Sequence, residues 1–316
     1  MGGPGLSRDA ERERRLAHLL AELRAQGLAE GLREFLPPEP RLAEELLRRG
    51  ANVGCRLYCH DTLDRAMEEA RRLTSEAEAA GRDPYSGTVV VAGELLNGRG
   101  RMGRAWYSPP GGVYLALQLA PELPPGRMGL YPLAAGVAAC TALRLHLPGA
   151  RLKWVNDVIV SGRKLCGLLS ESFHSPRHRQ EYLLLGVGAN ANITAFPEEL
   201  TGLATSLELE LGRAVDIEAL TASLLHHLGG WLALLHHHDQ RLLEEEFAEA
   251  PPPNPVVAAF RRLTDSLGRR VLWRAGDGDP GTTARAIDVA EDGGLVLELA
   301  GGARHTAHGG EILYLD

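Results

Sequence analysis

The stretch from residue 97 to residue 109 constrains this 316-residue chain more than any other part of it. It reads Asn-Gly-Arg-Gly-Arg-Met-Gly-Arg-Ala-Trp-Tyr-Ser-Pro, so three arginines alternate with three glycines, and no acidic residue occurs between Asn97 and Ala120. Apolar runs at residues 88–92 and 113–119 flank it, and both predict buried strands. The pattern therefore predicts a flexible, cationic loop that joins two core strands.

A loop of this composition suits a polyanionic ligand. Glycine lets backbone N–H groups approach a phosphate closely, and the arginine guanidinium binds phosphate or carboxylate oxygens in pairs. Taken alone, the motif is equally compatible with a solvated surface loop, so the rest of the chain has to decide between the two interpretations.

Composition excludes several classes of protein. The net charge is −7 and the isoelectric point about 6.0, which does not favour general binding to nucleic acid or to anionic membranes. No run approaches the length of a transmembrane helix, and the N-terminus lacks the apolar centre of a signal peptide. The four cysteines show neither paired nor zinc-binding spacing. We expect a cytoplasmic protein with free thiols.

Two further motifs follow the arginine loop in the chain. The first is Lys-Trp-Val-Asn-Asp at residues 153–157, followed by Gly-Arg-Lys-Leu-Cys-Gly at residues 162–167. The second is Gly-Val-Gly-Ala-Asn-Ala-Asn at residues 186–192, which closes an apolar strand. A turn at residues 161–164 places Lys164 at the edge of the sheet that carries the arginine loop. A lone turn lysine is usually solvated, so its role depends on the other motifs.

The order and spacing of these motifs resemble the biotin–protein ligase family. Members carry a Gly-Arg-Gly-Arg-x-Gly-Arg-x-Trp-x-Ser-Pro loop, Lys-Trp-Pro-Asn-Asp, a Lys-x-x-Gly strand and Gly-x-Gly-x-Asn-x-Asn, in this order. The resemblance covers residues 56 to 316. It implies an α+β fold: a mixed β-sheet catalytic domain flanked by helices, like that of class II aminoacyl-tRNA synthetases, and a small C-terminal SH3-like β-barrel. The expected units are a charged helical extension (1–53), the ligase-like domain (54–267) and the barrel (268–316).

The two ends of the chain fit this division. The first 50 residues are rich in leucine, alanine and charge, with nine arginines and nine acidic residues, and they predict two helices separated by a proline-rich break. Some members of the family carry an N-terminal winged helix-turn-helix that binds DNA. Here no wing hairpin and no net positive charge are present, so DNA binding is not expected. From residue 268 on, short strands alternate with glycine turns.

Two expectations concern helices of the central domain. A helix after residue 58 should begin at an N-cap formed by Asp61 or Thr62, with apolar residues on one face from Leu63 onward. A long helix should begin at Asp216, kink at Gly229-Gly230, and expose three consecutive histidines, His236 to His238, to solvent.

The resemblance implies a two-step reaction. Biotin first attacks ATP to give biotinyl-5′-AMP, and a lysine of a biotin carboxyl carrier protein then attacks this anhydride. Lys164, Arg101 and Arg99 would be catalytic, and Asp157 would help to hold Mg²⁺. The biotin-binding set would be Asp61, Thr62, Leu63, Leu95, Arg99, Gly100, Arg101, Lys164 and Gly167. The nucleotide-binding set would be Arg101, Arg104, Trp106, Lys153, Asn156 and Asn190.

The chain departs from the family pattern mainly where biotin would bind. Leu95 stands where members usually have glutamine, Val155 replaces the proline, and Asp61 and Leu63 stand where serine and asparagine are expected. A shift of one residue would instead align Thr62, Leu63 and Asp64 with the family's Ser-Thr-Asn. Two alternatives therefore stay open: a non-catalytic protein that binds an acyl-adenylate, or a ligase for another acid such as lipoate or octanoate. The Arg-Arg-x-Ser-Gly-Gly motif usual in lipoate-handling relatives does not occur.

Overall fold

The structure is a computed structural model that describes residues 7–39, 41–175, 179–244 and 252–316. A seven-stranded mixed sheet forms its centre, with the strand order β1-β2-β3-β7-β6-β5-β4. Only β1 and β2 are parallel among these neighbours. The strands are β1 (Arg56–Leu63), β2 (Thr88–Leu95), β3 (Val113–Leu119), β4 (Arg151–Lys153), β5 (Asp157–Val160), β6 (Arg163–Ser175) and β7 (Gln180–Ala189).

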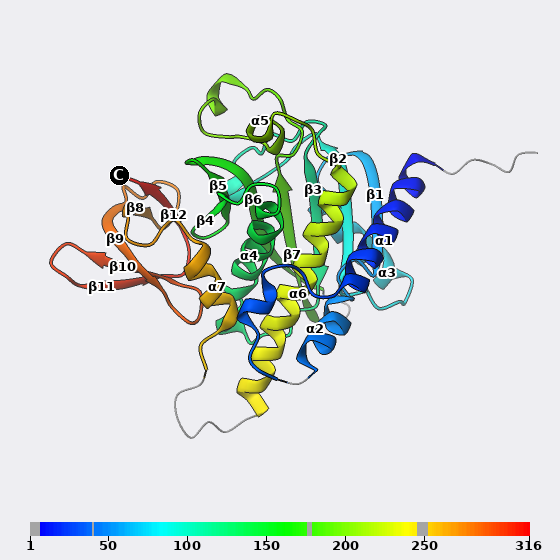
Figure 1. Ribbon diagram of the computed structural model, residues 1–316, viewed down its shortest axis with the longest axis horizontal. Helices are drawn as coiled ribbons and strands as arrows, with labels where there is room; N and C mark the ends of the chain where they lie inside the picture. Colours follow the sequence, from blue (N-terminus) through cyan, green and yellow to red (C-terminus); the bar gives the residue numbers. More distant parts are fainter. Residues whose placement is uncertain (1–6, 40, 176–178, 245–251) are drawn as a thin grey trace, which may run out of the picture.

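Helices cover both faces of this sheet (Figure 1). Because side chains alternate along a strand, Val89 and Val91 of β2 face the large core under α4 and α6, whereas Val90 faces the smaller cluster under α3. Helix α4 lies between the sheet and α6, so nearly all of its length is buried. The helices are α1 (Arg8–Gln26), α2 (Leu42–Gly50), α3 (Ala66–Ala79), α4 (Leu130–Arg144), α5 (Leu207–Leu211), α6 (Ile217–Glu244) and α7 (Pro255–Leu263).

The N-terminal helices pack against α6 and against the edge of the sheet. Leu16 and Leu20 of α1 are buried in the main core. Strand β1 is the edge strand, and α1 binds two of its backbone groups: the Glu13 carboxylate accepts from the Cys59 N–H (3.0 Å), and Arg12 donates to the His60 carbonyl (3.2 Å). An edge strand exposes unpaired backbone groups that invite pairing with another chain, and α1 removes part of that exposure.

The expected start of the third helix is wrong. Thr62 and Leu63 pair with Glu94 and Leu95 of β2, so the strand continues through Leu63, and α3 begins only at Ala66. The N-cap is Arg65, which makes no side-chain capping hydrogen bond. Parallel pairing with a buried strand therefore outweighed the local capping preference of Asp61 and Thr62.

Helix α6 is continuous through Gly229 and Gly230, contrary to the expected kink. The glycines serve a close contact between helices: a Cβ atom on Gly229 would lie 2.5 Å from the carbonyl oxygen of Gly50, at the end of α2. His237 and His238 are also buried rather than solvated, and the side chain of His236 is only 13% exposed. His236 Nε2 lies 3.0 Å from the Tyr131 hydroxyl, and His237 Nε2 lies 3.1 Å from a Glu39 carboxylate oxygen. Helix α6 packs against α1, α2 and α4. These three helices leave little of its surface for solvent, so the histidines meet protein groups instead.

A second, five-stranded antiparallel sheet ends the chain, with the order β11-β10-β9-β8-β12. It lies beside β4, β5 and α7 (Figure 1). Trp154 links the two parts, because its indole donates to the Gly293 carbonyl (3.3 Å) and its backbone N–H donates to Ser266 Oγ (3.0 Å). The expected fold class is confirmed, while the domain boundaries stay predictions. The strands are β8 (Arg270–Arg274), β9 (Thr282–Val289), β10 (Leu295–Leu299), β11 (Arg304–Ala307) and β12 (Glu311–Tyr314).

None of the helices in the described ranges combines the length and the apolar character that crossing a membrane requires.

Gly229→Ala tests the contact between α2 and α6. Alanine normally stabilises a helix interior by up to about 1 kcal/mol relative to glycine. Here its methyl group would meet backbone at 2.5 Å, so we expect the free energy of unfolding to fall by about 1–3 kcal/mol. Gly136→Ala in α4 is the control, because its Cβ would lie 3.4 Å from a leucine methyl group. Urea unfolding measures the stability of both variants. If Gly229→Ala is as stable as Gly136→Ala, the proposed close contact between α2 and α6 is wrong.

Candidate functional site

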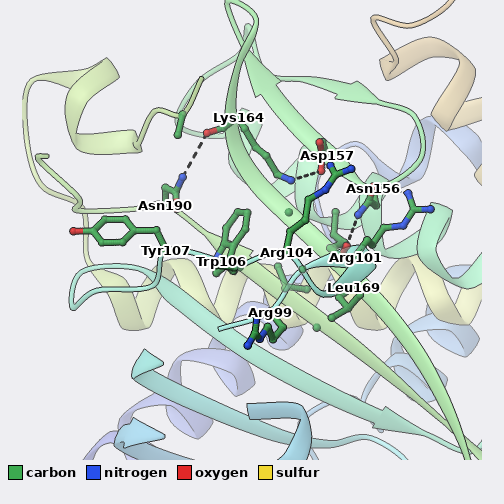
Figure 2. Close-up of a pocket in the computed structure, with 18 of the residues that line it drawn as sticks. Arg99, Arg101, Arg104, Trp106, Tyr107, Asn156, Asp157, Lys164, Leu169 and Asn190 are labelled. Atoms are coloured by element: carbon green, nitrogen blue, oxygen red, sulfur yellow. Dashed lines mark hydrogen bonds and ion pairs between the residues drawn. The ribbon is translucent and has the colours of Figure 1, made fainter. Parts of the chain in front are cut away.

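A cavity of about 590 Å³ lies over the middle of the sheet and collects most of the predicted residues. Its walls come from the loop at residues 97–109 (the arginine loop), from β6 and β7, from the segment at residues 196–204, from the start of α3, and from β12 of the second sheet. Figure 2 shows Arg104 of the arginine loop and Lys164 of β6 directed toward Asp157, with Trp106 beside them.

The arginine loop folds into a closed turn between β2 and β3. The Gly100 N–H donates to the Arg104 carbonyl (2.8 Å), and the Trp106 N–H donates to the Gly98 carbonyl (2.9 Å). A Cβ atom on Gly98 would lie 2.6 Å from Ser108 Oγ and 2.7 Å from the Trp106 carbonyl, so this closure requires glycine. In the structure these contacts close the loop into a turn over the sheet.

Each arginine of the loop has a different partner. Arg99 donates to the Gly103 carbonyl (2.9 Å), and Arg104 forms an ion pair with Glu311 of β12 (2.7 Å). Arg101 donates to the amide oxygen of Asn156 (3.3 Å), which is neutral and does not offset its charge. Burial lowers the pKa of Arg101, because it penalises the charged form. A bound anion would offset that penalty.

Two lysines add to the positive charge. Lys164 follows the turn after β5, and its ammonium lies 2.7 Å from Asp157 Oδ1 and 5.1 Å from the centre of the Trp106 ring (Figure 2). Burial lowers the pKa of Lys153, whose ammonium lies 5.0 Å from the centre of the Tyr314 ring. Cations therefore outnumber carboxylates around the middle of the cavity, as binding of a polyanion requires.

The indole of Trp106 lies against strands β6 and β7, where neighbouring positions are glycine. A Cβ atom on Gly188 would lie 2.7 Å from Trp106 Nε1, and one on Gly167 would lie 2.9 Å from Cζ3 of the same ring. The indole Nε1–H of Trp106 is buried and has no hydrogen-bond partner among the described residues. A ligand that fills the cavity can therefore accept from this donor.

Asn190 directly follows β7 and connects the cavity to the segment around Thr205. Its amide nitrogen donates to the Thr205 carbonyl (2.9 Å) and to the Lys164 carbonyl (3.4 Å), so both of its N–H groups have partners within the protein (Figure 2). Its Oδ1 is buried and unpaired among the described residues, so it remains able to accept one hydrogen bond.

The end of the cavity near α3 combines apolar and charged side chains. Its apolar lining comes from Ala66 and Met67 of α3, Leu95 of β2 and Leu169 of β6, and Gly186 leaves room beside Met67. Leu95 cannot form a hydrogen bond through its side chain. The charged residues that line the cavity in this region are Arg65, Glu68 and Glu171.

Most predicted residues line this cavity, but three do not. Asp61, Thr62 and Leu63 lie on β1, outside the lining. Asp61 and Thr62 are exposed; Asp61 lies 3.9 Å from Arg12, and the Thr62 hydroxyl lies 3.4 Å from Glu94. The predicted residues in the lining are Leu95, Arg99, Gly100, Arg101, Arg104, Trp106, Lys153, Asn156, Asp157, Lys164, Gly167 and Asn190.

Sequence reasoning missed the contribution of β12. Glu311 and Tyr314 line the cavity, although about 200 residues separate them from the arginine loop in the chain. No local pattern in the last strand marks either residue, and only the docking of the second sheet through Trp154 brings them to the site.

Comparison with known proteins agrees with this geometry. Residues 70–190 match the model of the biotin/lipoate A/B protein ligase family. The chain is 33% identical over 184 residues to the bifunctional ligase/repressor BirA of Bacillus subtilis, but this match spans 56% of the chain and 54% of that protein. It is 31% identical over 247 residues to the biotin–[acetyl-CoA-carboxylase] ligase of Mycobacterium tuberculosis, over 76% of the chain and 83% of that protein.

A solved structure gives the same result. The biotin protein ligase from Aquifex aeolicus in complex with biotin and ATP has a TM-score of 0.64 and 25% identity, and the likeness covers 82% of this chain and 98% of that one. The fold, the order of the motifs and the identity to a relative covered over most of its length lead to one conclusion. The chain belongs to the biotin–protein ligase family.

Proposed function

We propose that this protein is a biotin–protein ligase that activates biotin with ATP and transfers it to a lysine of a biotin carboxyl carrier protein. The observation that carries the proposal is one cavity that has apolar side chains at one end and cations at its centre. It offers Leu95 and Met67 at one end and Arg101 and Lys164 at the centre. A biotin molecule presents the matching order, with a ring and an aliphatic chain before its carboxylate.

The first step has to bring two anions together, the carboxylate of biotin and the α-phosphate of ATP. Catalysis of such a step depends mainly on positioning and on fixed positive charge. Lys164 is held by Asp157 at 2.7 Å, so its ammonium has a defined position before any ligand binds. Arg101 brings a charge that its contact with Asn156 leaves uncompensated. These two groups would neutralise the carboxylate and the phosphate where they meet.

The nucleotide would use the groups that lie on the other side of Trp106. The indole N–H and Asn190 Oδ1 are both unpaired among the described residues, and they offer one donor and one acceptor. Arg104 and Lys153 would bind phosphate oxygens. The Asp157 carboxylate fits Mg²⁺ that arrives with ATP, because Mg²⁺ usually takes only one or two protein carboxylates and keeps phosphate oxygens and water.

A second candidate acid is favoured by one observation. The family's glutamine is Leu95 here, and Asp61, Thr62 and Leu63 do not line the cavity, so the side chains expected to bind a ureido ring are absent from its lining. A linear or dithiolane acid such as octanoate or lipoate would not require such partners. A non-catalytic binder of an acyl-adenylate is the third alternative. Pyrophosphate exchange with a panel of acids separates all three.

Lys164→Ala should lower adenylate formation at least about 100-fold, because it removes a fixed cation from the point where two anions meet. The measurement is pyrophosphate exchange with biotin and ATP. Arg163→Ala is the matched control, since Arg163 is the neighbouring cation of the same turn and pairs with Glu210 at 2.8 Å. If the folded Lys164→Ala protein exchanges pyrophosphate as fast as Arg163→Ala, Lys164 is an ordinary solvated lysine of the turn and has no part in catalysis.

Leu95→Gln should tighten biotin binding. A buried polar ligand atom without a partner costs about 1–3 kcal/mol, so a new amide partner would strengthen binding by roughly five- to 150-fold. Titration calorimetry with biotin in the presence of ATP measures this effect. Octanoate, which has no ureido ring, is the control ligand and should gain nothing. If neither wild type nor Leu95→Gln binds biotin, biotin is not the substrate and the ligase acts on another acid.

Residues 98 to 106 should be mobile without ligand and ordered with the adenylate. Arg104 reaches only a partly exposed ion pair with Glu311, and such pairs contribute about 0–1 kcal/mol. Amide hydrogen exchange in this segment should therefore slow when biotin and ATP are added. Residues 113–119 of buried β3 serve as the internal reference. Equal protection of the loop with and without ligand would contradict the expectation.

A further inference from the structure

A second cavity, of about 450 Å³, lies beside the first. Its walls are the segment before and at the start of α4 (125–133), the middle of β6, and two turns of the C-terminal sheet, at residues 292–294 and 308–309. The residues assigned above to the acid (Met67, Leu95 and Leu169) and to the adenine (Trp106 and Asn190) do not line it. Its volume is within the range of about 300–1,000 Å³ typical of ligand sites.

The two cavities share a wall. Arg101, Asn156 and Leu168 line both. Asn156 is held by its backbone, which accepts from the Leu168 N–H (2.9 Å), and by its side chain, which donates to the Leu168 carbonyl (2.6 Å). Arg101 reaches Asn156 through one hydrogen bond of 3.3 Å, longer than the usual value of about 2.9–3.0 Å. Rotation of the Arg101 side chain would therefore open the wall without disturbing the strand.

The second step of the proposed reaction needs such a passage. When the acyl-adenylate forms, the acid and the nucleotide both occupy the first cavity. The amine of the acceptor has to reach the acyl carbon, which lies at the junction of the two. The second cavity meets the first at Arg101, the residue placed where carboxylate and phosphate join.

The chemistry of the second cavity changes from outside to inside. Its outer end carries Asp292 and His308, whose side chains are 43% and 62% exposed and lie 3.7 Å apart. Its inner walls include Leu133 and Leu168, both buried, and it ends at the Arg101 guanidinium. A carboxylate attracts an ammonium group, hydrocarbon walls suit an aliphatic chain, and a cation at the inner end favours a neutral amine over a charged one. This sequence of groups matches a lysine side chain.

We propose that the second cavity receives the acceptor lysine and delivers its amine to the acyl-adenylate past Arg101. This inference rests on the proposed function. The lysine ammonium gives one proton to the His308 imidazole at the outer end. The amine nitrogen then bonds to the acyl carbon, the bond from that carbon to the phosphate oxygen breaks, and AMP leaves with its electron pair. The proton that the nitrogen loses passes to the departing phosphate.

Two glycines allow the cavity to be filled without touching the first site. Gly126 and Gly309 line it from opposite sides, and a Cβ atom on either would meet nothing within 4 Å. Gly126→Trp and Gly309→Phe should lower biotin transfer to the carrier protein at least about tenfold in single-turnover assays. Pyrophosphate exchange should stay within about twofold of wild type, because no group of the first site changes. Gly149→Trp is the control, since Gly149 is equally open and lines neither cavity.

A cross-linking experiment tests the same point without catalysis. Gly309→Cys is placed in a Cys55→Ser background, because Cys55 is exposed and the other three cysteines are buried. A carrier protein whose acceptor lysine is replaced by cysteine should form a disulfide with this variant. It should not do so with Gly149→Cys in the same background.

The two proposals fail in different ways. Transfer at the wild-type rate by both filled variants, with no selective disulfide at Gly309→Cys, would overturn the cavity assignment and place the lysine's approach at the mouth of the first cavity. Absence of pyrophosphate exchange with biotin in the wild type would overturn the proposed function instead. A selective loss of transfer, with exchange intact and with the Gly309→Cys disulfide formed, is the result expected.

Discussion

The contact between the Trp106 indole and the bare backbone of β6 and β7 is the constraint on which the site depends. Gly167 and Gly188 lie under the ring, and a methyl group at either position would come within 3 Å of it. Because the ring packs against these strands, the arginines that precede Trp106 in the loop lie above the same surface. The cavity exists between that loop and the sheet, so its shape follows from the absence of side chains at two strand positions.

The electrostatics of the site follow from this arrangement. Arg101, Lys153 and Lys164 come from three different elements, yet the fold brings all three to one volume. Only Lys164 has a close carboxylate there, that of Asp157. Burial of Arg101 and Lys153 lowers the pKa of each, because it penalises the charged form of both side chains. A phosphate-bearing ligand supplies the missing negative charge, so binding and catalysis use the same imbalance.

The N-terminal and C-terminal parts of the chain support this site from outside. Helix α1 binds backbone groups of the edge strand through Arg12 and Glu13, which limits what can pair with β1. The C-terminal sheet is attached through Trp154, and it brings Glu311 to Arg104. The same attachment forms the second cavity, whose outer end consists of turns of that sheet. Both parts therefore shape how ligands and partners reach the centre.

The amino-acid sequence by itself determined the fold class, the family and most of the cationic residues of the cavity, because these depend on motifs whose residues are close together in the chain. The arginine loop, the Lys153–Asp157 motif and the Gly186–Asn192 motif each lie at the end of a strand, and the central sheet brings these strand ends together. Only the tertiary structure decided the start of α3, the burial of His237 and His238, and the role of Glu311. In each case a partner distant in the chain prevailed over a local preference: β2 extended β1 past Thr62, three helices surrounded α6, and the second sheet carried β12 to the arginine loop.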